Sequence, residues 1–154
     1  RAAIARESGL SIDHIEDLLD RYGSDIDLLL DMIEERPDLA NELKGAHEYL
    51  RAEIAFGVSH EGALHLEDLL ARRTRLTYEH ADRGLSAAEE IATLAGELLG
   101  WDEATKEAEL ASYRSRCEAE AAAQKITSEA EAQKVREEAE DITPFLDVAP
   151  EIQG

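Results

Sequence analysis

The sequence has very little of the residue types that stabilise secreted or membrane-spanning proteins. Its 154 residues include a single cysteine, Cys117, so an internal disulfide framework is excluded and a reducing compartment is favoured. The longest unbroken run of Leu, Ile or Val covers only residues 28–30, which is far too short for a transmembrane helix. No basic start is followed by an apolar stretch, so no secretory signal is predicted. We therefore expect a soluble, cytoplasmic chain.

Basic residues are also scarce. The 16 Lys and Arg residues stand against 36 Asp and Glu, which gives a formal net charge of −20 at pH 7. A sequence-independent grip on nucleic acid depends on Lys and Arg that displace phosphate counterions, and docking on an anionic membrane face depends on the same residues. The composition therefore excludes sequence-independent binding of nucleic acid and argues against docking on an anionic membrane.

Residues that favour β-strands are few. The chain has 3 Val and 7 aromatic residues, but 25 Ala, 20 Leu and 10 Ile. Leu, Ala, Glu, Arg and Lys lose little conformational entropy in a helix, whereas β-branched and aromatic residues favour strands. No segment alternates apolar and polar residues long enough to indicate a half-buried strand. The sequence predicts a single all-α domain of about six helices with a long C-terminal helix.

Helix-start and helix-stop residues divide the chain. Ser11 is a candidate N-cap, Gly23 follows the first helix where a left-handed C-cap is expected, and Pro37 stops the second helix. Two capping boxes are predicted, Ser24 with Asp27 and Ser86 with Glu89. The predicted helices are residues 11–22, 24–36, 47–58, 64–70 with a continuation at 76–80, 86–99 and 102–141; residues 41–45 are a predicted polar link and residues 143–154 a predicted irregular tail.

Apolar spacing predicts which helix faces are buried, and it weakens along the last helix. The predicted core-facing residues include Ile12, Ile15, Leu18 and Leu19 of the first helix, Ile91, Leu94, Ala95, Leu98 and Leu99 of residues 86–99, and Trp101 as an anchor after Gly100. Beyond Cys117, the large apolar residues before Ile142 are only Ile126 and Val135. We expect this distal Ala/Glu-rich half to project from the domain, to fray, or to associate with another chain.

The absence of several motifs excludes the binding sites that depend on them. No glycine-rich phosphate-binding loop is present, and one cysteine cannot form a cysteine zinc cluster. His60 and His65 superficially resemble a metalloprotease zinc helix, but zinc-binding histidines there are four residues apart, whereas these are five apart, about 140° around a helix. They are better interpreted as surface or capping histidines. Cys117 is interpreted as a buried structural thiol. We predict no catalytic, cofactor-binding or metal-binding residue in this chain.

One short segment opposes the overall acidity. Between residues 69 and 83 the arginines Arg72, Arg73, Arg75 and Arg83 stand against Glu79 and Asp82. In one interpretation these arginines hold neighbouring acidic helices together through bidentate pairs. In the other they form an anion site or a docking surface for another domain. The sequence leaves both interpretations open.

Residues 61–75 resemble a family signature. The run contains Glu-Gly-Ala followed by Asp68-x-Leu70-x-Arg72-Arg73-Thr74-Arg75, and this order is similar to the C-terminal helical domain of FAD-dependent glycerol-3-phosphate dehydrogenases and the related oxidases. The Arg-Tyr-Gly-Ser turn at residues 21–24 is similar to that family as well. Further agreement lies at residues 82–84, 98–101 and 113–114, so that the resemblance spans about residues 11–124.

The resemblance implies a parent enzyme that oxidises glycerol 3-phosphate to dihydroxyacetone phosphate, with FAD as hydride acceptor and quinone or oxygen as electron acceptor. Residues 1–124 would be the helical cap domain, and residues 125–154 an extension outside the family pattern. The partner would be a catalytic FAD domain of the same polypeptide. That domain is missing from this sequence, so we expect the chain alone to be non-catalytic. The parent enzyme would be cytoplasmic or peripheral on the inner face of the plasma membrane.

The sequence has two alternative interpretations besides a domain of an enzyme. A non-enzymatic helical interaction or scaffold module is supported by the long Ala/Glu-rich helix. A DNA-binding helix-turn-helix over residues 11–32 is rejected, because its second helix carries five acidic residues against Arg36 alone and would repel phosphate. The upstream coding sequence would separate the enzyme from the scaffold, since only the enzyme requires a flavin fingerprint there.

Overall fold

The computed structural model describes the backbone of residues 2–153 and the side chains of residues 2–139. It divides into two compact units, Arg1–Arg114 and Ser115–Gly154. The described backbone is predominantly helical, which confirms the predicted all-α class, although the first unit also contains a small two-stranded sheet.

The first unit begins with one helix that was not predicted, at residues 2–8, followed by helices whose ends partly match the prediction. They are α1 (Ala2–Ser8), α2 (Ile12–Tyr22), the 3-10 turn η1 (Gly23–Asp25) and α3 (Ile26–Glu35). The Ser11 side chain accepts a hydrogen bond from the His14 backbone at 3.2 Å, so the predicted N-cap is confirmed. Gly23 has a φ of 57°, which explains the glycine there. The predicted Ser24 capping box is wrong, because Ser24 lies inside η1 and the N-cap of α3 is Asp25, which makes no side-chain cap hydrogen bond.

Residues 42–50 form an unpredicted β-hairpin. After the 3-10 turn η2 (Pro37–Ala40), β1 (Glu42–Leu43) pairs antiparallel with β2 (Ala46–Leu50), and Gly45 makes the turn with a φ of 83°. The polar link and the helix start at residue 47 were therefore wrong predictions. The segment is extended because its Leu43, Tyr49 and Leu50 side chains are each at most 1 % exposed in the core. Tertiary burial outweighs local helix propensity here.

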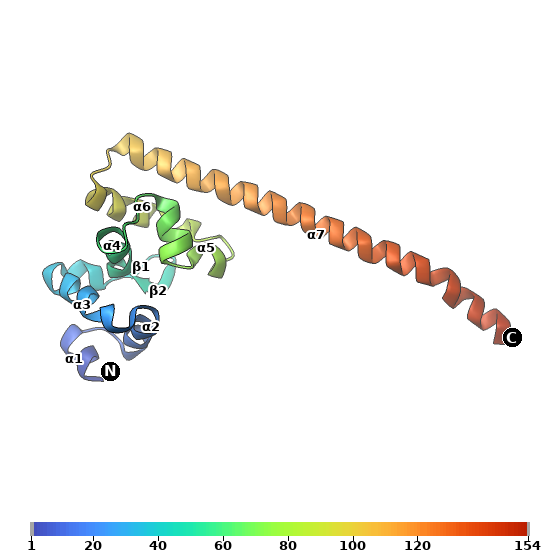
Figure 1. The fold of residues 1–154 in the computed structure, drawn as a ribbon, viewed down its shortest axis with the longest axis horizontal. Helices are drawn as coiled ribbons and strands as arrows, with labels where there is room; N and C mark the ends of the chain where they lie inside the picture. Colours follow the sequence, from blue (N-terminus) through green and yellow to red (C-terminus); the bar gives the residue numbers. More distant parts are fainter. Residues whose placement is uncertain (1, 154) are drawn as a thin grey trace. The chain divides into compact units, whose positions relative to one another are not determined.

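The core forms where α4 (Arg51–Ser59) packs against α6 (Leu85–Leu99), as Figure 1 shows. Ile54 and Ile91 are fully buried. Leu98, in the last turn of α6, is 40 % exposed, contrary to the prediction. Ile12, in the first turn of α2, is likewise exposed.

The start of α6 uses a different cap from the predicted one. The Asp82 carboxylate accepts hydrogen bonds from the Gly84 and Ser86 backbone N–H groups at 3.0 and 2.9 Å. Gly84, with a φ of 79°, occupies the N-cap position itself. The predicted Ser86–Glu89 box is wrong because Asp82 has already taken its role.

The last helix, α7, runs from Glu103 to Gln153. Asp102 caps it, since its carboxylate accepts a hydrogen bond from the Thr105 backbone at 2.7 Å. Trp101 lies next to Gly96 but is only partly buried, and the predicted burial of Cys117 is confirmed. The irregular tail was a wrong prediction for the backbone of residues 143–153, which is helical. A proline lacks one backbone N–H and disfavours a helix interior, but the backbone is helical on both sides of Pro144 and Pro150. Residue 154 lies outside the described residues.

A search of the described residues for membrane-spanning segments finds no helix with the length and apolarity that crossing a bilayer requires.

One carboxylate inside the first unit joins three elements. Glu53, near the start of α4, is 1 % exposed and accepts hydrogen bonds from Arg21 Nε of α2 at 2.8 Å and from the Leu50 backbone of β2 at 2.7 Å. Burial raises the pKa of Glu53, and the Arg21 guanidinium opposes that rise. Because a buried charge is tolerated only when it is paired and hydrogen-bonded, both partners are needed.

We predict that Glu53→Ala lowers the free energy of unfolding by about 3–5 kcal/mol, because it leaves a buried N–H and Arg21 without their acceptor. The matched control is Glu97→Ala. Glu97 also binds an arginine, Arg36, but its side chain is 51 % exposed, so its loss should cost at most about 1 kcal/mol. Urea denaturation of both variants measures the difference. Equal losses would contradict the structural importance given to Glu53.

We also predict that the distal part of α7 is the least protected helix. The side chains of residues 121–139 are exposed, including Ile126 at 66 % and Val135 at 65 %, so little apolar burial stabilises this segment. In hydrogen exchange, amides of residues 119–139 should exchange well before those of residues 91–98. Equal protection of the two segments in a monomeric sample would show that this prediction is wrong.

Candidate functional site

Three of the four predicted arginines line one groove. This arginine groove has a volume of about 560 Å³, and its wall combines cationic and aromatic side chains with two acidic residues. Its lining residues are Arg21, Tyr22, Asp25, Leu28, Phe56, His60, Glu61, Arg72, Arg73 and Arg75.

A π-helix presents two of these arginines. Residues Asp68–Arg73 form η3, a π-helical turn in the region where the sequence predicted an α-helix. It packs closely on α4 at Gly57, where an added Cβ would lie 2.9 Å from the Leu69 side chain and 3.4 Å from Arg73 Cβ. Thr74 ends the turn by donating both its backbone N–H and its hydroxyl to the Leu69 carbonyl, at 2.9 and 2.8 Å. π-Helical turns are rare in proteins, and those that do occur often lie at functional sites.

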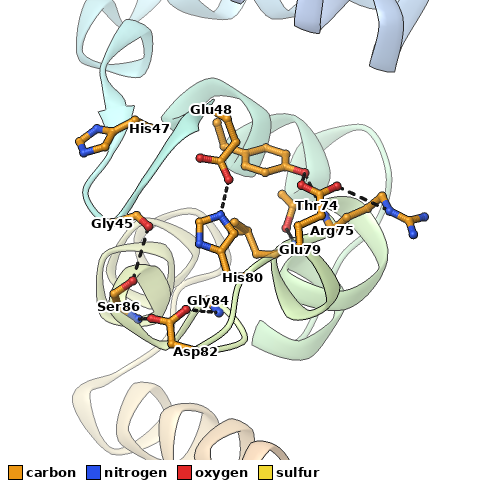
Figure 2. Close-up of polar contacts among 12 residues, drawn as sticks. Gly45, His47, Glu48, Thr74, Arg75, Glu79, His80, Asp82, Gly84 and Ser86 are labelled. Atoms are coloured by element: carbon orange, nitrogen blue, oxygen red, sulfur yellow. Dashed lines mark hydrogen bonds and ion pairs between the residues drawn. The ribbon is translucent and has the colours of Figure 1, made fainter.

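The hairpin holds the segment that follows η3. The Tyr49 hydroxyl of β2 accepts a hydrogen bond from the Arg75 backbone at 3.2 Å and donates one to Glu79 of α5 (Leu76–Glu79) at 3.3 Å. His80 binds the carboxylate of Glu48, also on β2, as Figure 2 shows. Burial alone would raise the pKa of Glu48, but the hydrogen bond from His80 contributes to a net lowering. The unpredicted hairpin therefore fixes the backbone that carries Arg75.

The fourth arginine of the groove, Arg21, is held firmly. Its Nε binds Glu53, its Nη2 donates to the Glu48 carbonyl at 2.9 Å, and its guanidinium lies 4.4 Å from the centre of the Tyr49 ring. In the sequence, Arg21 stands out only as part of the Arg-Tyr-Gly-Ser turn. That turn was the one signal that could have placed it in the site.

The two outer arginines, Arg72 and Arg75, make long ion pairs, and the Arg75 guanidinium also lies 5.9 Å from the centre of the Tyr78 ring. Arg72 lies 3.7 Å from Asp68 and Arg75 lies 3.6 Å from Glu79, distances too long for hydrogen bonds, and both side chains are 73 % exposed. Arg73 is intermediate, with Glu61 at 3.3 Å.

Arginines elsewhere in the first unit are bound more tightly. Arg36 binds Asp38 at 2.8 Å and Glu97 at 2.9 Å, and Arg51 binds Glu90 at 2.8 Å. Arg36 and Arg51 thus match the interpretation that arginines hold helices together, and the outer arginines of the groove match it poorly.

Aromatic side chains form the apolar wall of the groove. Phe56 stacks on His60 with ring centres 4.8 Å apart, and Tyr22 meets Phe56 edge-on at 5.3 Å. Burial, followed by the nearby Glu53 carboxylate, raises the pKa of the Tyr22 hydroxyl. Leu28 adds a 41 % exposed apolar side chain. The groove can therefore bind a group that is both anionic and apolar.

The remaining predicted residues lie elsewhere. Arg83 is not among the residues that line the groove; it has a φ of 56°, and its carbonyl accepts a hydrogen bond from the Tyr113 hydroxyl at 2.6 Å. His65 does not join His60, because it binds Glu109 of α7 at 2.8 Å, a contact that raises the pKa of His65. Among the residues that the structure describes, no three His, Cys, Asp or Glu side chains are grouped so that they could hold a metal ion.

Comparison with known proteins gives a consistent result. A family model described as the C-terminal domain of alpha-glycerophosphate oxidase matches residues 1–106. The glycerol-3-phosphate dehydrogenase of Mycobacterium leprae is 41 % identical over 121 residues, which cover 79 % of this chain and 21 % of that protein. Glycerol-3-phosphate dehydrogenase 2 of Mycobacterium tuberculosis is 43 % identical over 116 residues, 75 % of this chain and 20 % of that protein. The mitochondrial glycerol-3-phosphate dehydrogenase of Bos taurus is 33 % identical over 78 residues, 51 % of this chain and 11 % of that protein.

The chain spans about a fifth of the length of these mycobacterial relatives. No solved structure matches it significantly. The family match includes η3 and every residue that lines the arginine groove, and it confirms the resemblance found in the sequence. Because the matched region is more than half of the chain, this protein belongs to the family of C-terminal domains of alpha-glycerophosphate oxidase.

Proposed function

We propose that this chain is the C-terminal domain of an FAD-dependent glycerol-3-phosphate dehydrogenase and that it packs against the catalytic domain through the arginine groove. The parent enzyme oxidises glycerol 3-phosphate to dihydroxyacetone phosphate, FAD accepts the hydride, and quinone or oxygen accepts the electrons. The observation that carries this proposal is the family match over residues 1–106, together with mycobacterial dehydrogenases that are 41–43 % identical over at least three quarters of the chain.

The groove supports a docking role more than a catalytic one. Its lining offers guanidinium donors and an aromatic wall, which are the side chains enriched where protein surfaces meet. In this proposal residues 1–124 form the docked domain and residues 125–154 form a helical extension. The family resemblance is the basis for placing the parent enzyme in the cytoplasm or at the inner face of the plasma membrane.

A second candidate function is a helical interaction or scaffold module without an enzymatic parent. The exposed side chains of residues 121–139 favour it, because a long helix with exposed Ile126 and Val135 can pair with another copy. Such pairing is also compatible with the enzyme. An upstream flavin fingerprint in the coding sequence separates the two functions.

The proposal is tested on the intact gene product. We expect it to purify with bound flavin, identified by its absorbance, and to reduce a dye when glycerol 3-phosphate is added. Residues 1–154 alone should bind no flavin and reduce no dye, because they contain no glycine-rich phosphate-binding loop. An intact protein without flavin would contradict the proposal that the parent is a flavoenzyme. Flavin bound to residues 1–154 would contradict the proposal that the flavin is held by a separate catalytic domain.

A second prediction concerns the groove in the intact enzyme. The double variant Arg72→Ala and Arg73→Ala should lower stability or raise the KM for glycerol 3-phosphate, since it removes two cations from the docking surface. The loss in unfolding free energy should be about 1–3 kcal/mol, typical of a few interface residues. The control is Arg136→Ala, because that arginine lies on the exposed part of α7, where it donates a hydrogen bond to Gln133 at 2.8 Å.

Thermal unfolding, flavin content and steady-state kinetics measure the outcome. Flavin chemistry should persist in the double variant. Complete loss of turnover with a normal fold and full flavin occupancy would instead place these arginines in the active site.

A further inference from the structure

We propose that the arginine groove receives a carboxylate-bearing segment of the catalytic domain, with an apolar side chain against the Phe56 wall and Asp or Glu side chains on Arg72 and Arg75. This inference rests on the proposed function, because it takes the partner to be part of the same polypeptide. It adds the chemistry of that partner.

The sign of the charge selects an acidic partner. Four arginines line the groove with two acids, Asp25 and Glu61, in a chain whose net charge is −20. Arg21 is neutralised by the buried Glu53 and Arg73 is paired with Glu61, so the exposed Arg72 and Arg75 carry the positive charge that faces a partner. A basic segment would be repelled by these two guanidinium groups, whereas carboxylates would be attracted.

The outer arginines are arranged to bind carboxylates. A guanidinium offers five N–H donors in a planar fork that matches a carboxylate in bidentate geometry. Among the described residues, neither Arg72 nor Arg75 makes a side-chain hydrogen bond, since their acidic neighbours lie 3.7 and 3.6 Å away. A partner carboxylate could therefore bind each guanidinium without breaking a hydrogen bond inside the domain.

The inner part of the groove is preorganised. Arg21 uses two of its five donors on Glu53 and on the Glu48 carbonyl, so it stands in a fixed position. Arg73 is tied to Glu61. A binding surface that is already ordered loses little conformational entropy when its partner arrives, which raises affinity.

The size and wall of the groove favour a polypeptide segment over a small anion. A volume of about 560 Å³ is far larger than a phosphate ion requires, and Phe56, Tyr22 and Leu28 line it with apolar surface. The carboxylates of Asp25 and Glu61 would also repel a dianion held deep in the groove. A segment that alternates apolar and acidic side chains could contact both the aromatic wall and the outer arginines.

Zero-length cross-linking in the intact enzyme tests the proposal. A carbodiimide joins an amine to a carboxylate that it touches, and arginine does not react. Arg72→Lys and Arg75→Lys, made separately, keep the charge and add a reactive amine. We expect each to give new cross-links, identified by mass spectrometry, to Asp or Glu residues outside residues 1–154. The cross-links should weaken several-fold at high salt, because screening shortens the range of charge attraction.

Controls separate this partner from the alternatives. Arg136→Lys, on the exposed part of α7, should give no cross-link to the same acids. Mixed light- and heavy-isotope enzyme distinguishes the same polypeptide from a second copy. Cross-links confined to Asp68 or Glu79, cross-links only between copies, or complete suppression by inorganic phosphate would each overturn the proposal.

A measurement on the wild-type enzyme covers the case in which a lysine variant fails to fold. An arginine-directed dicarbonyl reagent should modify Arg72 and Arg75 several-fold more slowly in the intact enzyme than Arg136. Equal rates would overturn the proposal, since both side chains would then still be exposed. Failure of this proposal can be distinguished from failure of the proposed function. An active flavoenzyme whose Arg72 and Arg75 are unprotected would contradict only the carboxylate-bearing partner. A protein without flavin whose position 72 cross-links to another segment would contradict only the assignment as an enzyme.

Discussion

The carboxylate of Glu53 lies almost fully buried at the start of α4 and binds Arg21 of α2 and the backbone of β2. A charge in that position would be costly without both partners, so the two neighbouring elements must be in place for α4 to be stable. The same pair sets Arg21 over the Tyr49 ring, and the Tyr49 hydroxyl in turn binds the Arg75 backbone. The groove is thus continuous with the core through a chain of specific contacts.

That chain of contacts explains how an acidic domain maintains a cationic groove. The inner arginine is neutralised by a buried acid, whereas the side chains of Arg72 and Arg75 are exposed and make only weak contacts with Asp68, Glu79 and Tyr78. Gly57 contributes by letting η3 approach α4, since any larger residue would meet Leu69. The position of the arginines is therefore determined by the packing of the scaffold, and their side chains remain available to a partner.

Two kinds of arginine coexist in this domain. Arg36 and Arg51 connect elements through short hydrogen bonds to carboxylates, and these contacts are complete within the first unit. Arg72 and Arg75 lie at distances that leave their donors without an acceptor among the described residues. Because both kinds have nearby acids in the sequence, only the distances in the folded structure separate a structural arginine from one suited to a docking surface.

The sequence by itself determined what local chemistry controls. Helix-forming composition gave the all-α class, the side-chain oxygen of Ser11 gave a confirmed N-cap, and the ordered run 61–75 identified the family. Tertiary structure decided the hairpin at residues 42–50, the π-helical form of η3 and the entry of Arg21 into the groove. These features depend on partners about 15 to 50 residues away, such as Glu53 for Arg21 and Gly57 for Arg73. Local propensity contains no information about such partners, because the free energy that fixes these features comes from burial and pairing in the folded core.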